Sequence, residues 1–543
     1  MPPDSGRTLV RQGSVLSLLT LGSRVLGLLR EMTKASLLGT SALSDAFSVA
    51  FMIPNLFRRL FAEGSVAVAF IPTFKEYLLA EAGDRAGAAG EKAGLNESRA
   101  GKETAEFLSC AFTLLSFFVS MAVAAGILLS PLIIPLFGKE EFNETVFLTR
   151  LMFPFLGFIS LAALFQGILN SLHVFTPPGL APIVLNLVTI LCAYGLFPFT
   201  KNPARAMAIG ILAGGFLEAA VQFPFVLKKR RRFFFVSLGR ALNNPGAQKV
   251  LRLIGPTVIG MAAYQINDLV STALARNAGT GIVSSLQYSL RLQELILGVF
   301  AVSIGTVLLP DLAEYAKSLR WDIYNRRLIA AMDIIALVTV PITFFTLAQG
   351  ETLIRLLFQN RSFNDESVRL TLSALRCHMP GLFFIALNRI LAPAFYAQSD
   401  SKSPTLAGLI SFGVNIGLAF LLVRPLRGAG IALALTLSSA VNTALLLAFL
   451  RRNPHVAVAR ALRSALAYTA RLAVFSVLAA APLLPLGPRL TAFFAGRGRL
   501  VSYGIPFALS ACIFAAIGIL LLFISRDKQA TALVKMLRRR GKE

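Results

Sequence analysis

Residues 12–38 read QGSVLSLLTLGSRVLGLLREMTKASLL, a mainly apolar stretch that contains Arg24, Arg30, Glu31 and Lys34. The stretch is long enough to cross a bilayer, because a transmembrane helix needs about 20 apolar residues. A charged side chain in the middle of a lipid-facing helix costs at least about 2.5–3.5 kcal/mol. The stretch therefore predicts a membrane helix whose charges face a water-filled cavity or each other.

The rest of the chain has the same apolar character. Of its 543 residues, 55% are hydrophobic and only 15% are charged, with a mean hydropathy of +0.69. Soluble proteins carry about 25% charged residues, so an ordinary soluble fold is excluded. The predicted fold is an all-α integral membrane protein with about 14 transmembrane helices, near residues 12–38, 44–78, 104–136, 146–171, 180–199, 204–227, 250–275, 281–313, 327–349, 367–397, 404–423, 428–450, 464–486 and 501–524.

The chain carries a net charge of +26, and most of its basic residues lie between the apolar segments. An even number of spans puts both termini on one side, and the excess of Lys and Arg on that side predicts cytoplasmic termini. The strongest basic runs are 228–232, 451–452 and the tail 526–543, where we expect contact with anionic lipids. The tail also predicts an amphipathic interfacial helix with Leu533, Met536 and Leu537 among its basic residues. The charge has this explanation without a nucleic-acid partner, and we expect none.

Connections and cysteines suggest little further chemistry. Residues 80–102 are rich in Ala, Gly and mixed charge, which predicts a mobile cytoplasmic loop. The four cysteines lie in apolar segments without a CxxC spacing. We therefore expect buried thiols, and neither a disulfide nor a metal site.

The two halves of the chain contain matching motifs. Residues 71–77 (IPTFKEY) recur at 309–315 (LPDLAEY), and Arg150 and Pro154 have counterparts in Arg376 and Pro380. A six-span unit returns to its starting side, so the two copies share one orientation, as in transporters with parallel repeats. The predicted domains are an N-lobe at 1–227, a basic interfacial linker at 228–249, a C-lobe at 250–450, two added helices within 451–525 and the basic tail 526–543.

Segment 44–78 and the second copy also carry charges: Asp45, Arg58, Arg59, Glu63, Asp268, Arg291 and Glu294. Internal ion pairs would account for part of them, namely Arg59 with Glu63, Arg30 with Glu31 or Asp45, and Arg291 with Glu294. Arg24 and Lys34 have the alternative of reaching the nearest interface. If Arg24, Arg30, Arg58 and Arg291 instead face one cleft, the excess of cations predicts an anionic cargo, since guanidinium binds phosphate in bidentate fashion.

Four motifs together are specific: residues 23–30 (SRVLGLLR), 44–47 (SDAF), 54–64 (PNLFRRLFAEG) and 298–310, with GVF at its start and GTVLLP at its end. They closely resemble the MurJ (MviN-type) lipid II flippases, and the resemblance covers essentially the whole chain. That family belongs to the multidrug/oligosaccharidyl-lipid/polysaccharide exporter superfamily. The resemblance implies two six-helix lobes around a V-shaped cationic cavity, with helices 13 and 14 forming a groove for a lipid tail.

The family's activity implies transport of lipid II, an undecaprenyl-pyrophosphate-linked disaccharide-pentapeptide, from the inner to the outer leaflet of the bacterial cytoplasmic membrane. The resemblance places substrate-binding arginines at Arg24, Arg30, Arg58 and Arg291, and a motif carboxylate at Asp45. We expect Glu31, Arg59, Glu63 and Glu294 to support or gate the cavity. The family usually has Asp at the position of Glu31, which keeps the charge on a longer side chain.

The resemblance also bears on the energy source and the partners. Sodium-binding members use an Asp that matches Asp268 and an Asn that matches Asn415. They also have an Asp one turn after that Asn, at a position where this chain has Ala419. We therefore expect no organic cofactor, and either sodium or the membrane potential as the source of energy. Cell-wall synthesis proteins are the further partners that this activity implies.

Two other transport functions stay open, a flippase for another polyprenyl-linked saccharide and a cation-coupled multidrug exporter. A membrane-bound glycosyltransferase or polymerase would need a catalytic carboxylate on an external loop, and the external loops near 139–144 and 351–366 are short. A purely structural scaffold would leave the intramembrane arginines unexplained. We therefore expect a transporter and not an enzyme.

Overall fold

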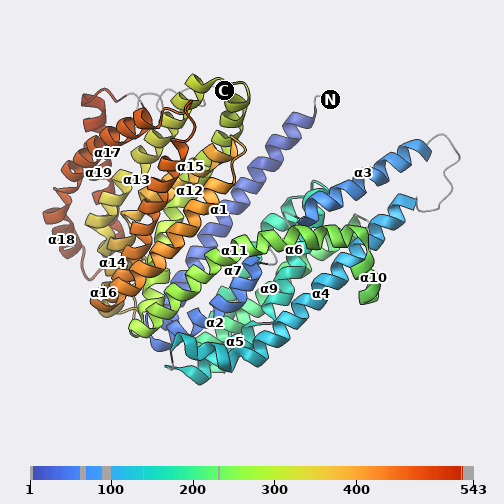
Figure 1. Ribbon diagram of the computed structural model, residues 1–543. Coiled ribbons are helices and arrows are strands. Elements are labelled where there is room, and N and C mark those ends of the chain that lie inside the picture. The colour runs from blue at the N-terminus through green and yellow to red at the C-terminus, as the bar shows by residue number, and fades with distance from the viewer. Residues whose placement is uncertain are drawn as a thin grey trace. The chain divides into compact units, whose positions relative to one another are not determined.

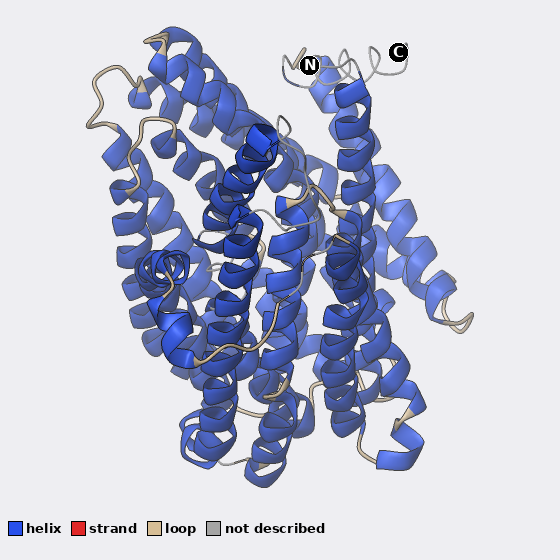
Figure 2. Ribbon diagram, turned by 90° about the vertical axis from the view of Figure 1, so that its right-hand side faces the viewer, coloured by secondary structure: helices blue, strands red, loops and turns tan. Residues whose placement is uncertain are grey.

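The computed structural model describes residues 4–60, 69–88, 99–138, 140–229, 231, 233–527 and 529. These residues form helices joined by short connections and contain no strand (Figure 2). The chain divides into two compact units, Met1–Ala273 and Leu274–Glu543, which we describe one at a time. The predicted all-α fold is confirmed for the described residues.

Unit 1, Met1–Ala273, begins with two helices that carry the charged motifs (Figure 1). Its elements are α1 (Asp4–Leu38), α2 (Ala42–Arg58), α3 (Ile71–Ala88), α4 (Arg99–Ile133), η3 (Ile134–Phe137), α5 (Phe142–Met152), α6 (Phe155–Ser171), α7 (Thr176–Gly195), α8 (Phe197–Thr200), α9 (Pro203–Lys228), α10 (Leu238–Asn243) and α11 (Pro245–Ala278), which runs on into the second unit.

Unit 2, Leu274–Glu543, consists of long helices and the C-terminal pair. Its elements are α12 (Ile282–Lys317), α13 (Trp321–Phe358), α14 (Asp365–His378), α15 (Gly381–Tyr396), α16 (Lys402–Leu450), α17 (Val458–Ala480), α18 (Leu483–Phe493), η4 (Leu500–Gly504) and α19 (Ile505–Ile524). Among the described residues, eight helices are long and apolar enough to cross a membrane, or nine if the bent pair α14–α15 is one span. The count of fourteen stays a prediction.

The repeated motifs mark the same structural feature in both units, a helix broken at a proline. In unit 1, α5 ends at Met152 and α6 starts after Pro154; in unit 2, α14 ends at His378 and α15 starts after Pro380. Proline removes a backbone donor and crowds the preceding turn, which explains both breaks. The motif pairing seen in the sequence is therefore a structural pairing.

α16 contains the two predicted segments 404–423 and 428–450. The helical conformation is interrupted at Arg427, which has a left-handed φ of 48°. Beyond this point the chain turns back, because Ser438 lies beside the first half of α16. The hydroxyl of Ser411 donates to the backbone carbonyl of Ser438 at 2.7 Å, and the hydroxyl of Ser438 donates to Asn415 Oδ1 at 3.3 Å. The two predicted segments are thus confirmed as two antiparallel helices.

α16 starts with a hydrogen-bonded cap. Asp400 Oδ1 accepts hydrogen bonds from the backbone N–H groups of Lys402 and Ser403, each at 3.0 Å. Hydrogen bonding, above all to the side chain of Ser403, holds the pKa of Asp400 below its usual range. The cap therefore favours the ionised carboxylate.

The predicted loop at 80–102 is wrong over much of its length. α3 continues to Ala88, and α4 starts at Arg99, where an ion pair of 3.2 Å joins Arg99 and Glu103 across one turn. Ala and Glu are strong helix formers. In residues 80–88 and 99–102 their helix propensity outweighs that of the glycines. The predicted tail helix, with Leu533, Met536 and Leu537, lies outside the described residues.

The segment 233–236 follows α9 and lies along α4. The backbone N–H groups of Phe234 and Val236 donate to the hydroxyls of Ser109 and Thr113, both at 3.1 Å. Ion pairs also connect α10 and α11 to α3 and α4: Arg240 of α10 pairs with Glu106, and Lys249 of α11 pairs with Glu76. Just before the segment, Arg231 pairs with Glu81 of α3. α11 begins at Pro245, inside the range predicted as a linker.

Candidate functional site

In unit 1, the predicted substrate-binding arginines come from two helices. Arg24 and Arg30 lie on α1, and Arg58 ends α2. Arg30 forms an ion pair with Glu31 at 3.0 Å, one of the pairings left open by the sequence, while Arg58 Nε donates to Asn55 Oδ1 at 2.8 Å. Arg24 makes no hydrogen bond or ion pair with the described residues, so its guanidinium retains its full capacity to bind an anion.

A buried polar contact joins α1 to α2 beside these arginines. The ammonium group of Lys34 is buried, donates to Ser48 Oγ at 2.5 Å and lies 5.9 Å from the centre of the Phe47 ring. Asp45 is fully buried in the first turn of α2, where the helix dipole favours a negative charge. Lys34 therefore fastens the two motif helices to each other and does not reach an interface.

Arg59 lies near an acid that the sequence did not pair with it. Its Nη1 is 3.9 Å from the Asp268 carboxylate on α11, with side chains 36% and 48% exposed. The predicted partner Glu63 lies outside the described residues. Because Asp268 lies next to a guanidinium here, its carboxylate already balances a charge without a metal ion.

The residues suggested for sodium do not form a ligand cluster in the described part of either unit. Asn415 is buried in unit 2, where it accepts a hydrogen bond from Ser438, and Asp268 belongs to unit 1. No group of three or more His, Cys, Asp or Glu residues that could hold a metal ion occurs among the described residues. Sodium binding stays a prediction.

In unit 2, Arg291 lies nine residues into α12, about 14 Å from its start at 1.5 Å per residue. It pairs with Glu294 one turn on, at 3.4 Å, which is the other pairing that the sequence left open. Its Nε is buried without a hydrogen-bond partner in the described chain. Pairing with Glu294 thus leaves part of the guanidinium available to a further acceptor.

The comparisons with known proteins identify the family. A model of one protein family, described as "Lipid II flippase MurJ", matches residues 34–496. The chain belongs to the MurJ family. It is 43% identical over 534 residues to the "Probable lipid II flippase MurJ" of Treponema pallidum (strain Nichols), covering 98% of this chain and 99% of that protein. It is also 35% identical over 455 residues to the "Lipid II flippase MurJ" of Burkholderia cenocepacia, covering 80% and 82%.

Solved structures support the fold of this MurJ-family chain. A "Lipid II flippase MurJ, inward closed conformation" aligns with a TM-score of 0.74 at 23% identity and covers 94% of this chain and 99% of that one. An inward-facing multidrug transporter of the MATE family and the MOP superfamily aligns with a TM-score of 0.67 at 14% identity, covering 83% and 98%. The resemblance inferred from the motifs is thereby confirmed, and the fold is shared with multidrug transporters.

Sequence reasoning missed the polar contacts at the broken helix of unit 2. Three side chains from three helices donate to backbone carbonyls at the break. Thr436 of α16 donates to Cys377 at 2.7 Å, Gln293 of α12 donates to His378 at 2.5 Å, and Thr343 of α13 donates to Met379 at 3.2 Å. Polar residues at one level of several neighbouring helices are the signal that could have predicted this arrangement.

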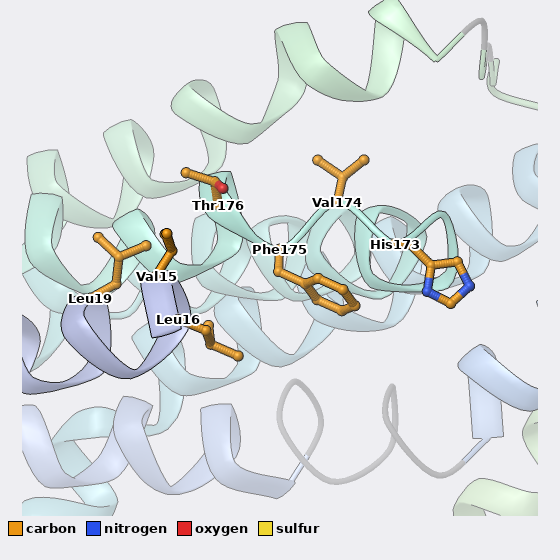
Figure 3. A pocket seen from close by; sticks show the side chains of 7 residues that line it. All are labelled: Val15, Leu16, Leu19, His173, Val174, Phe175 and Thr176. Carbon is orange, nitrogen blue, oxygen red and sulfur yellow. The ribbon is translucent and has the colours of Figure 1, made fainter. Parts of the chain in front are cut away.

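A cavity of about 220 Å³ lies in unit 1 between α1 and the connection from α6 to α7 (Figure 3). Its lining includes five apolar side chains together with the His173 ring and the Thr176 side chain, and consists of Val15, Leu16, Leu19, His173, Val174, Phe175 and Thr176. None of the predicted substrate-binding arginines lines it. All four cysteines are free thiols; Cys110 is buried as predicted, Cys192 and Cys377 are only partly buried, and the prediction of a buried thiol is wrong for the exposed Cys512.

Proposed function

We propose that this MurJ-family protein moves lipid II from the inner to the outer leaflet of the bacterial cytoplasmic membrane. The observation that carries the proposal is the 43% identity, along nearly the whole of both chains, to a relative named as a probable lipid II flippase. The arginines that the motifs place on α1, α2 and α12 support an anionic headgroup as the cargo. The excess of basic residues on the side of the termini supports cytoplasmic ends.

The chemistry of the proposed step is binding without bond making or breaking. Arg24, Arg30, Arg58 and Arg291 neutralise the pyrophosphate through charge-assisted hydrogen bonds. Glu31 and Glu294 compete for two of these guanidinium groups, so they limit how tightly the cargo is held and help its release. The polyprenyl tail stays in lipid beside α17 and α19.

Transport against a gradient needs an energy source, and we propose the membrane potential. Moving one charge across 100 mV is worth about 2.3 kcal/mol. Sodium, with Asp268 and Asn415 as ligands, is the second source to test by exchanging sodium for potassium. A flipping rate that does not change on this exchange would exclude sodium.

The exposed segment that follows α9 supports a second partner, the anionic membrane surface. Lys228 and Lys229 are exposed, and so are the rings of Phe234 and Phe235, at 68% and 72%. Aromatic side chains next to basic ones favour the headgroup layer, and each basic residue gains about 1 kcal/mol from anionic lipid. Docking with cell-wall synthesis proteins would use the remaining cytoplasmic surface.

The test is replacement of the native flippase in cells by this protein or by its Arg24→Ala, Arg58→Ala or Arg291→Ala variant. Arg369→Ala is the matched control, since Arg369 is an exposed arginine paired with Glu366. At matched expression, the wild type and the control should restore growth and surface-exposed lipid II, and the three variants should not. Drug export or export of another saccharide without lipid II flipping would reject the proposal, and full rescue by the variants would reject the assigned arginines.

A further inference from the structure

The connection between α17 and α19 carries three arginines and no acid. It consists of residues 481–504, which include α18 and η4, and its only charged residues are Arg489, Arg497 and Arg499. No Asp or Glu occurs anywhere in residues 401–526. All three arginines are exposed. The function described above uses none of them.

Contacts within unit 2 place this connection at one end of the helices. Arg499 Nη1 donates to the backbone carbonyl of Gln359, just after α13, at 3.0 Å. The other end of α13 lies at the start of α17, where Asn325 is hydrogen-bonded to the backbone of His455 and of Ala457, at 2.9 and 3.0 Å. α13 and α17 therefore run in the same direction, and α19 returns from the connection to the opposite end. With the cytoplasmic ends proposed above, the connection is on the outer side, where the positive-inside rule does not explain an excess of arginine.

One side of α18 is fixed to the other helices of unit 2. Leu483 is buried in an apolar cluster with Phe514 of α19, and α18 lies beside that helix (Figure 1). One turn later, Gly487 lies so close to α13 that an added Cβ would be 2.7 Å from Gln349 Nε2. Because these contacts use one side of the short helix, its other side faces away from the protein.

The outward side of the connection has apolar side chains next to its arginines. Leu484, Phe493 and Leu500 are 65%, 70% and 73% exposed. The guanidinium group of Arg497 lies 5.9 Å from the centre of the Phe493 ring and 6.0 Å from that of Phe494. A segment with this composition lies in the membrane interface, where apolar side chains enter the hydrocarbon and basic ones reach the headgroups.

The acids at this end of unit 2 are occupied by other arginines. Glu351 and Asp365 pair with Arg355, at 2.9 and 2.5 Å, and Glu366 pairs with Arg369. The three arginines of the connection form no ion pair with the part of the chain that the structure describes; their contacts are one backbone carbonyl and two rings. Their remaining N–H groups are available to an acceptor outside the protein, and phosphate is the acceptor whose charge and geometry match guanidinium.

We propose that the connection 481–504 is a docking surface for the phosphate headgroups of anionic phospholipids, on the membrane side opposite the end of α19. The exposed rings and leucines insert among the acyl chains, and the three arginines bind the phosphates above them. The exposed apolar surface lies against bulk lipid, so the phospholipid headgroup is the most abundant phosphate within reach. Lipid binding does not depend on the proposed function, whereas the assignment to the outer leaflet rests on the cytoplasmic ends proposed there.

The experiment measures hydrogen exchange of the full-length protein in nanodiscs of phosphatidylcholine, alone or mixed with phosphatidylglycerol. In peptides that cover 488–504, the wild type should exchange at least about fivefold more slowly in the mixed nanodiscs, since each basic residue near anionic lipid is worth about fivefold in binding. Replacement of Arg489, Arg497 and Arg499 together by Ala should abolish the difference. Replacement of all three by Lys keeps the charge and should preserve it, as should the control Arg369→Ala at the same end of unit 2.

Three results would overturn the proposal. The first is equal exchange of the wild type in both kinds of nanodisc, because apolar contacts alone would then hold the connection. The second is a wild-type difference that persists in 1 M salt, where the Debye length is about 3 Å; this measurement needs no variant and decides the case if the alanine variant does not fold. The third is slower exchange with an equal amount of lipid II but not with phosphatidylglycerol, which would assign the surface to the cargo.

A labelling experiment tests the leaflet separately. In intact spheroplasts, Arg497→Cys should react with a membrane-impermeant maleimide more than the wild type with its own four cysteines does, and Lys229→Cys should not. Reaction of Lys229→Cys without reaction of Arg497→Cys would reject both the outer leaflet and the proposed orientation. The exchange measurements would then still decide whether the connection binds anionic phospholipid.

Discussion

The end of α19 is held by a buried ion pair, and removal of that pair should loosen it. After α19 the chain turns at Arg526, which has a φ of 49°, and brings the carboxylate of Asp527 to the guanidinium of Arg471 on α17. The Asp527 side chain is fully buried. It also accepts hydrogen bonds from the hydroxyl of Tyr468 at 3.2 Å and from the backbone N–H of Gln529 at 3.0 Å. The perturbation we consider is Arg471→Ala.

The variant leaves Asp527 buried without its cation. Removing one partner of a buried ion pair costs about 3–5 kcal/mol. Because 39% of the Arg471 side chain is exposed, solvent screens part of the interaction, and we expect about 2–3 kcal/mol. Since each 1.4 kcal/mol is a factor of ten, opening of this end of α19 should become about 30- to 150-fold more favourable.

Hydrogen exchange followed by mass spectrometry in nanodiscs measures this opening in peptides that cover residues 517–527. Arg369→Ala, which removes an exposed pair with side chains 77% and 51% exposed, is the control and should change exchange less than about twofold. Adding Asp527→Asn to Arg471→Ala should restore most of the protection, because it removes the uncompensated charge. Exchange at the wild-type rate in Arg471→Ala, or no recovery in the double variant, would refute this reasoning.

Three further changes test a close helix contact, a hydrogen bond at the broken helix of unit 2 and the cap of α16. Gly214→Ala should lower the melting temperature, with a cost of about 1–3 kcal/mol, because the new Cβ would lie 2.8 Å from a side chain of α7; Gly413→Ala, which meets nothing within 4 Å, should not lower it. Thr436→Val should cost about 1 kcal/mol, since the carbonyl of Cys377 loses its donor, and equal melting would contradict this. Asp400→Asn should lower the free energy of unfolding above about pH 4, where the ionised Asp400 carboxylate with its lowered pKa stabilises the cap. The difference in stability between the wild type and the variant should vanish as the pH falls through that pKa.

The sequence is sufficient to predict the features that a single residue type marks locally. Pro154 and Pro380 mark the two broken helices, and the turn within α16 lies at Arg427, just before Gly428 and soon after Pro425. These residues act on their own backbone, so their effect does not depend on distant contacts. The charged motifs of α1 and α2 likewise predict the family, which the comparisons confirm.

Contacts between distant segments could not be predicted, since several pairings satisfy the same charge pattern. Arg59 lies beside Asp268, more than two hundred residues away, a pairing that the spacing of Arg59 and Glu63 did not suggest.

The two broken helices differ in what holds them, and this difference explains their geometry. In unit 1, the Phe153 ring lies against Gly126, where an added Cβ would be 2.0 Å from it, and α5 and α6 together satisfy the criteria for one span. In unit 2, α14 and α15 are bent by 45°. A large bend exposes backbone carbonyls, which are costly to leave unbonded in a membrane. The donors Thr436, Gln293 and Thr343 satisfy these carbonyls, so unit 2 can hold a bend that the apolar packing in unit 1 would not stabilise.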